Sequence, residues 1–127
     1  MSIQVDPKEF EEIAHEEFDA LPAAFRNRLE NVHIVVEETD SRSRKRRAGV
    51  YRSSMLLGLY EGVPLSRRGT GYGVYPVVPD RITLFQRNIE HTVSSQEELR
   101  ERIREVMVHE IAHHFGMSEK EIRDAGY

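Results

Sequence analysis

The pattern of apolar and polar residues predicts two helices at the start of the chain. Within residues 6–19 the apolar side chains recur every three or four positions, as on one face of a helix, and they are Phe10, Ile13, Ala14 and Phe18. Asp6 occupies the N-cap position and Pro7 the first helical position, where proline is favoured. A second, shorter helix is predicted from Pro22 to Leu29.

Three segments in the middle of the chain have the pattern of β-strands. β-Branched residues dominate 31–38 (NVHIVVEE), an apolar run lies within 53–62 (SSMLLGLYEG), and apolar and polar residues alternate in 81–86 (RITLFQ). Prolines and glycines concentrate in residues 64–79, which predicts a long loop between the second and third strands.

The last third of the chain predicts a long helix followed by a short one. Apolar residues recur with helical spacing from about residue 95 to residue 115, and Ser94 with Glu97 has the spacing of a capping box. Gly116 follows where a C-terminal cap glycine belongs, and a second capping-box spacing at Ser118 begins the final helix. The predicted order is therefore two helices, three strands and two helices in one domain covering residues 1–127.

Composition limits the chemistry that this domain can perform. The 127 residues include no cysteine, so thiolate metal ligands, disulfides and a cysteine nucleophile are excluded. Any metal ion must be held by histidine or carboxylate side chains. The chain has no apolar stretch near the roughly 18 residues of a membrane helix and does not begin like a secretory signal. We therefore expect a cytoplasmic protein with no membrane partner.

Charge is distributed unevenly along the chain. The formal net charge is −4, from 18 basic and 22 acidic residues, yet residues 42–47 (RSRKRR) carry five cations. Five clustered cations could contact phosphates, but no aromatic residues are interleaved with them and the protein is acidic overall. We interpret segment 41–49 as a solvated loop and expect no nucleic-acid partner.

The long predicted helix contains an HExxH sequence formed by His109, Glu110 and His113. Residues four apart lie on one helix face, so the two imidazoles can converge on one ion, with Glu110 beside the ion without binding it. Zinc lowers the pKa of bound water from about 15.7 to about 7 and polarises a carbonyl. The motif therefore predicts metal-activated water attacking a peptide carbonyl, with Glu110 as the general base that later protonates the departing amine.

The residues after the motif suggest a third metal ligand. Gly116 lets the chain leave the helix sharply, which can carry Glu119 back toward the ion. Two histidines, a carboxylate and a water molecule make an open catalytic zinc site. A carboxylate at the start of a helix is also favoured by the helix dipole without any metal, and Asp124 and Glu121 are alternative ligands. Zinc is the expected ion, although this ligand set would accept other divalent ions.

The chain resembles the small bacterial zincin-like metallopeptidases, also called minimal zincins. The similar segments are 56–65 (LLGLYEGVPL), 79–86 (PDRITLFQ) and 109–122 (HEIAHHFGMSEKEI), with weaker similarity at 10–22. The resemblance implies an α+β fold in which a short mixed sheet of about three to four strands packs on the HExxH helix. It also implies zinc at His109, His113 and a carboxylate or histidine at position 119.

The resemblance implies a peptidase that acts on a peptide or protein substrate. In zincins the substrate pairs with the edge strand above the metal, and segment 81–86 is our candidate for that edge. The alternative is a zinc-stabilised binding or regulatory domain without physiological peptidase turnover. Replacing Glu110 by glutamine separates the two, because it should preserve zinc and fold while abolishing cleavage.

Overall fold

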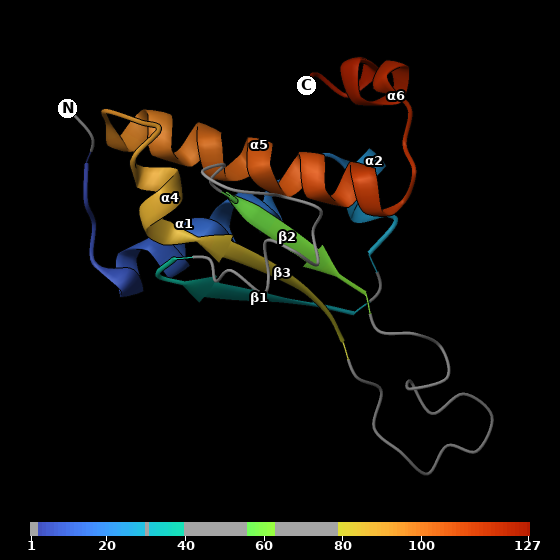
Figure 1. The fold of residues 1–127 in the computed structure, drawn as a ribbon. Helices are drawn as coiled ribbons and strands as arrows, with labels where there is room; N and C mark the ends of the chain where they lie inside the picture. The colour runs from blue at the N-terminus through green and yellow to red at the C-terminus, as the bar shows by residue number, and fades with distance from the viewer. Residues whose placement is uncertain (1–2, 30, 40–55, 63–78) are drawn as a thin grey trace, which may run out of the picture.

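The computed structural model describes residues 3–29, 31–39, 56–62 and 79–127 and shows an α+β fold (Figure 1). In chain order its elements are α1 (Pro7–Asp19), α2 (Ala23–Arg26), β1 (Val32–Glu37), β2 (Gly58–Glu61), β3 (Asp80–Phe85), α4 (Gln86–Glu90), α5 (Gln96–His114) and α6 (Glu119–Asp124). The basic segment 41–49 and nearly all of the predicted loop 64–79 lie outside the described residues.

The three strands form a mixed sheet in the order β1-β3-β2. β3 pairs in parallel with β1, with Ile34 opposite Ile82, and antiparallel with β2, with Tyr60 opposite Ile82. The prediction that segment 81–86 forms the edge strand is therefore wrong, because β3 has a strand on each side. Its last four residues are all buried, as expected for a central strand.

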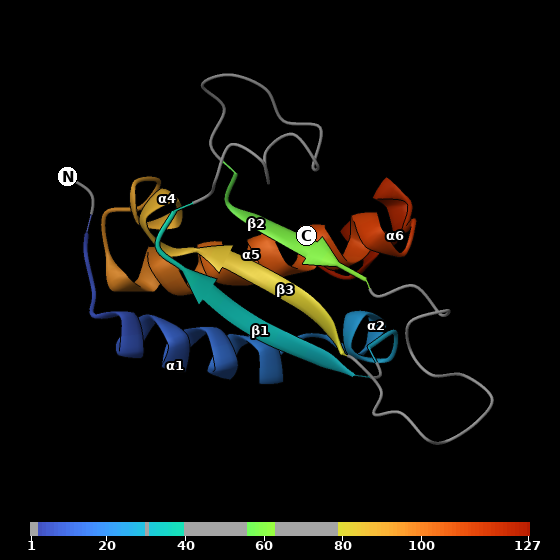
Figure 2. The same cartoon turned by 60° about the horizontal axis from the view of Figure 1, so that its bottom comes forward.

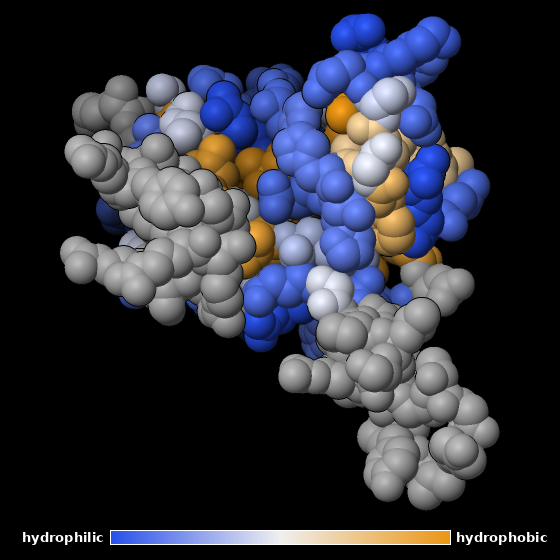
Figure 3. All heavy atoms as spheres, turned by 45° about the vertical axis from the view of Figure 1, so that its right-hand side comes forward, coloured by the Kyte–Doolittle hydropathy of each residue, from blue (hydrophilic) through white to orange (hydrophobic). Residues whose placement is uncertain are grey.

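Helices α1 and α5 pack on one face of this sheet. α5 contacts β2 and β3, while α1 contacts β1 and α5 (Figures 1 and 2). The fully buried side chains between the layers include Phe10, Phe25, Ile82, Leu84, Ile103 and Met107. Among the coloured residues in Figure 3, hydrophilic ones cover most of the surface, with hydrophobic residues showing between them in smaller areas. Within the described ranges, no helix is long and apolar enough to cross a membrane.

The predicted first helix is confirmed, and it includes a buried charge that the pattern did not predict. Pro7 is its first residue and Asp6 precedes it, although the Asp6 side chain makes no capping hydrogen bond. Glu17 is only 6% exposed. Its carboxylate accepts hydrogen bonds from Arg104 Nε at 2.8 Å and from Arg100 Nη1 at 3.4 Å, both on α5. These bonds join α1 to α5.

The structure adds a short helix, α4, that the sequence pattern did not predict. The predicted strand 81–86 ends at Phe85, and the chain turns directly into this helix. Its buried polar side chains bind backbone elsewhere in the fold: Asn88 Nδ2 donates to the Leu56 carbonyl oxygen at 2.8 Å, and Glu90 Oε2 accepts from the Val5 N–H at 2.8 Å. These partners are distant in sequence, so local periodicity does not indicate them.

Both ends of the long helix are fixed by side-chain and backbone caps. α5 begins after Ser95, whose hydroxyl accepts from the Glu98 N–H at 3.1 Å, so the cap lies one residue after the predicted Ser94. At the other end Gly116 has a φ of +66°, which glycine adopts without strain. The Met117 N–H then reaches back to the Ala112 carbonyl oxygen at 2.8 Å, as in a Schellman motif.

The final helix begins with the predicted capping box. The Ser118 hydroxyl accepts from the Glu121 N–H, and the Glu121 carboxylate accepts from the Ser118 N–H, each at 3.1 Å. The predicted second helix is also present but shorter than expected, because α2 covers only Ala23–Arg26.

Candidate active site

The last two turns of α5 bring His109 and His113 together on an exposed helix face. Their ring centroids lie 6.1 Å apart, with the ring planes inclined at 52°. Two imidazoles bound to one zinc ion at about 2.0–2.1 Å have centroids roughly 5–5.5 Å apart in tetrahedral geometry. A small side-chain rotation therefore allows both rings to bind the same ion, so these two residues fit the metal that the motif predicts.

Glu110 lies on the adjacent side of the helix, turned toward the sheet. Its Oε1 accepts a hydrogen bond of 3.2 Å from the main-chain N–H of Tyr60 in β2. Burial raises the pKa of Glu110 above its usual value, while the Tyr60 N–H and the nearby His113 partly offset this rise. A carboxylate with a raised pKa, held beside two potential metal ligands, is well suited to accept and return a proton.

β2 lies very close to α5 at this site because it begins with a glycine. A Cβ atom on Gly58 would lie 2.5 Å from Cγ1 of Val106. A groove of about 270 Å³ opens beside this contact, and its walls include Leu56, Leu57, His109 and Glu110. The HExxH motif therefore borders a recess beside the start of β2.

The described residues do not assemble a complete metal site. No group of three histidine, aspartate or glutamate side chains within these ranges is arranged to hold a metal ion. His109 and His113 are brought together, whereas Glu119 is the exposed first residue of α6, beyond the turn at Gly116. The role of Glu119 as third ligand stays a prediction.

The two alternative carboxylates on α6 already have partners. Glu121 caps the helix and pairs with Arg28 at 3.2 Å, and the Ser118 N–H is the main cause that lowers its pKa. Asp124 pairs with Lys120 at 3.4 Å. Among the described residues the Glu119 side chain makes no hydrogen bond or ion pair. Of the three carboxylates, Glu119 would lose the fewest contacts on binding a metal.

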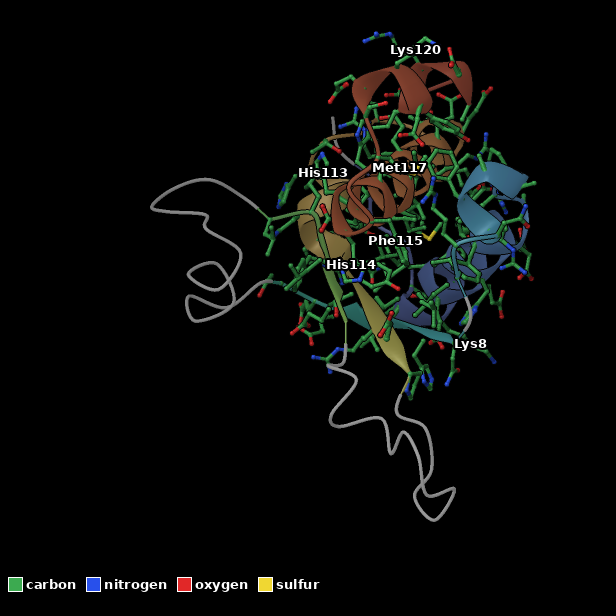
Figure 4. The ribbon with its side chains drawn as sticks, turned by 90° about the vertical axis from the view of Figure 1, so that its right-hand side faces the viewer. Lys8, His113, His114, Phe115, Met117 and Lys120 are labelled. Atoms are coloured by element: carbon green, nitrogen blue, oxygen red, sulfur yellow. The ribbon has the colours of Figure 1, made fainter. Side chains whose placement is uncertain are left out.

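His114 points away from His113, as their adjacent positions on a helix predict (Figure 4). Its ring stacks on Tyr60, with centroids 4.0 Å apart and planes at 23°. Tyr60 is not among the candidate residues predicted from the sequence. A signal for Tyr60 was nevertheless present in the sequence. Gly58 and Gly62 lie two residues before and after it, and glycines at this spacing indicate a strand face that another element approaches closely.

Comparisons with known proteins identify the family and support the fold. The family profile described as "Zincin-like metallopeptidase" matches residues 29–127. A solved structure from Thermo thermophilus, described as a "Conserved hypothetical protein", has the same fold, with a TM-score of 0.55 and 18% sequence identity. The similarity covers 87% of this chain and 94% of that chain. No curated protein matches. Because the profile spans most of the chain and includes the whole HExxH helix, the chain belongs to the zincin-like metallopeptidase family.

Proposed function

We propose that this protein is a zinc-dependent peptidase in which Glu110 is the general base. The observation that carries this proposal is the position of Glu110. Its carboxylate lies beside His109 and His113 and accepts a hydrogen bond from the Tyr60 N–H. Membership of a metallopeptidase family supports the same chemistry.

The proposed metal ligands are His109, His113 and Glu119. The two imidazoles supply neutral nitrogen donors, and a carboxylate as third ligand leaves one position open. When bound, zinc supplies Lewis acidity toward water and toward the substrate carbonyl. Bringing Glu119 to the two histidines requires the chain after Gly116 to rearrange. Gly116 has a positive φ, a backbone conformation that glycine adopts without steric cost.

Glu110 moves the proton in the proposed reaction. Its carboxylate takes a proton from the attacking water and passes it to the nitrogen of the departing amine, so the enzyme ends the cycle in its starting protonation state. Burial favours this role because it raises the pKa of Glu110 above its usual value, which makes the carboxylate a stronger base.

The substrate of the proposed reaction is a peptide lying along the outer side of β2. This strand pairs with β3 on one side, and the described residues place no strand on its other side. An extended peptide can add there through main-chain hydrogen bonds, except at the Tyr60 N–H, which already donates to Glu110. The adjoining groove, with Leu56, Leu57 and Val106 in its walls, can receive an apolar side chain.

A second candidate function is a zinc-stabilised binding or regulatory domain without peptidase turnover. The ground for it is that the family match gives no activity for this chain and no curated enzyme matches, so the fold is equally compatible with binding alone. Such a domain would keep the fold and the metal but cleave no peptide. The cytoplasmic location expected from the sequence stays a prediction.

Glu110→Gln separates the two functions. Zinc-loaded wild type is incubated with a broad peptide library, and products are identified by mass spectrometry. Glu110→Gln should bind zinc and fold as wild type does, yet lose cleavage by roughly 10²–10⁴-fold because the general base is absent. Glu101→Gln, an exposed residue on the same helix with the same change of charge, is the matched control and should cleave normally.

Three other results of this experiment would contradict the peptidase proposal or the role of Glu110 in it. If folded, zinc-loaded wild type cleaves no peptide in the library, the binding domain is favoured. If the folded protein takes up no zinc, both candidate functions fail. If Glu110→Gln cleaves as fast as wild type, Glu110 is not the base.

A further inference from the structure

The strand next to the HExxH helix carries only one side chain on the face that meets the helix. Residues 58, 60 and 62 share that face, and two of them are glycine. A Cβ on Gly58 would lie 2.5 Å from Val106 Cγ1, and a Cβ on Gly62 would lie 2.7 Å from His114 Cε1. Only Tyr60 therefore places a side chain between this part of the strand and α5.

The side chain of Tyr60 is held at both its hydroxyl and its ring. The hydroxyl donates to Asp80 Oδ2 on the neighbouring strand at 2.6 Å. The ring stacks on His114 at 4.0 Å between centroids and meets the Phe115 ring edge-on at 5.8 Å. Tyr60 is 8% exposed, so its own side chain is largely shielded from water, whereas His114 is an exposed residue.

The main chain of the same residue binds Glu110. The Tyr60 N–H donates to Glu110 Oε1 at 3.2 Å. Glu110 and His114 are four residues apart, so they lie one above the other on successive turns of α5. Tyr60 thus contacts two successive turns of α5: its ring stacks on His114, and its N–H donates a hydrogen bond to Glu110. Figure 4 shows His114 on the side of α5 that faces the strands.

We propose that Tyr60 is a positioning residue, whose side chain, through His114 and Asp80, fixes the place of its own N–H and thereby orients the Glu110 carboxylate. This inference rests on the proposed function, since the orientation matters for catalysis only if Glu110 is the base. Tyr60 itself exchanges no proton with the substrate.

Geometry explains why such positioning is needed. A displacement of about 1 Å at a catalytic group can reduce the rate by as much as about 100-fold. One hydrogen bond fixes a single distance and leaves the carboxylate free to rotate about it. Because the glycines bring the strand close to the helix and the Tyr60 ring prevents sliding, the donor itself has a fixed place.

The first test measures amide hydrogen exchange by NMR in the metal-free protein, so it needs no activity. In wild type the residue-60 amide should exchange slowly, and Glu110→Ala should accelerate it roughly five- to tenfold by removing the acceptor. Tyr60→Ala and His114→Ala should accelerate it similarly, whereas His114→Phe should restore slow exchange because it keeps a stacking ring. Tyr60→Phe, which keeps the ring and removes only the hydroxyl, tests the Asp80 contact in a variant that should fold.

The second test measures kcat, KM and zinc affinity in the same variants. We expect kcat to fall roughly 10- to 100-fold in Tyr60→Ala and His114→Ala, with KM and zinc affinity within about threefold of wild type. His114→Phe should regain most of kcat. Tyr127→Phe, which removes a tyrosine hydroxyl from a ring that packs edge-on against Phe25 of α2, is the control and should leave kcat as in wild type.

Three results would overturn the inference. The first is residue-60 exchange that stays slow in both alanine variants. The second is a fall in zinc affinity that parallels the fall in kcat, because His114 would then act through the adjacent His113. The third is an unchanged kcat in both alanine variants. If wild type cleaves no peptide, the proposed function fails, and amide exchange still decides whether the Tyr60 side chain controls the contact with Glu110.

Discussion

Gly58 of β2 packs directly against Val106 of α5, with no room for a side chain between them. A Cβ on residue 58 would lie 2.5 Å from Cγ1 of Val106 and 3.2 Å from the Thr83 carbonyl oxygen. Gly58→Ala must therefore push the strand away from the helix or distort both. We expect it to lower the free energy of unfolding by about 1–3 kcal/mol, measured by chemical denaturation.

A second substitution tests whether the Gly58 effect comes from this contact. Val106→Ala removes the atom that the new Cβ would meet, so the double variant Gly58→Ala/Val106→Ala should lose less stability than the sum of the single variants. Purely additive losses would show that the strain lies elsewhere.

Glu119 should be the carboxylate of α6 that binds zinc. We expect Glu119→Ala to weaken zinc binding by at least about tenfold, measured by competition with a chromogenic chelator, because a ligand is lost. Glu121→Ala should instead lower stability slightly, because it removes one of the two hydrogen bonds of the capping box, with little effect on zinc. Equal zinc affinity in wild type and Glu119→Ala would point to a different third ligand.

Glu17 should matter more for stability than its neighbour Glu16, although both pair with Arg100. Glu17 is buried and binds Arg104 as well, whereas Glu16 is exposed. We expect Glu17→Ala to lower the free energy of unfolding by about 2–3 kcal/mol, since Arg104 and Arg100 lose the buried acceptor that they share. Glu16→Ala should cost less than about 1 kcal/mol. Equal losses in urea denaturation would contradict this assignment.

The raised pKa of Glu110 predicts a pH-dependent cost to folding. A carboxyl whose pKa is higher in the folded state stabilises that state below the ordinary value of about 4.3, and the contribution is lost as pH rises through the folded pKa. Glutamine never ionises. The metal-free Glu110→Gln variant should therefore gain stability over wild type at pH 7.5 but not at pH 4. Denaturation curves with the same difference at both pH values would show that the pKa is not raised.

The elements with strong local signals were predicted well from the sequence. The long apolar period of α5, the cap at Ser118 and the glycine at 116 each act within a few residues, so the chain itself specifies them. Helix α4 was missed because its buried Gln86, Asn88 and Glu90 bind segments distant in sequence, which come together only when the chain folds.

The HExxH sequence alone determined which residues carry the candidate chemistry, because four-residue spacing on a helix puts His109 and His113 on one face. Only the tertiary structure decided which strand adjoins them. The alternation of 81–86 indicates a strand but not its neighbours, which depend on pairing between segments far apart in the chain. The same long-range pairing brings the Tyr60 N–H to the Glu110 carboxylate. These residues are 50 positions apart, so no local pattern predicts their hydrogen bond.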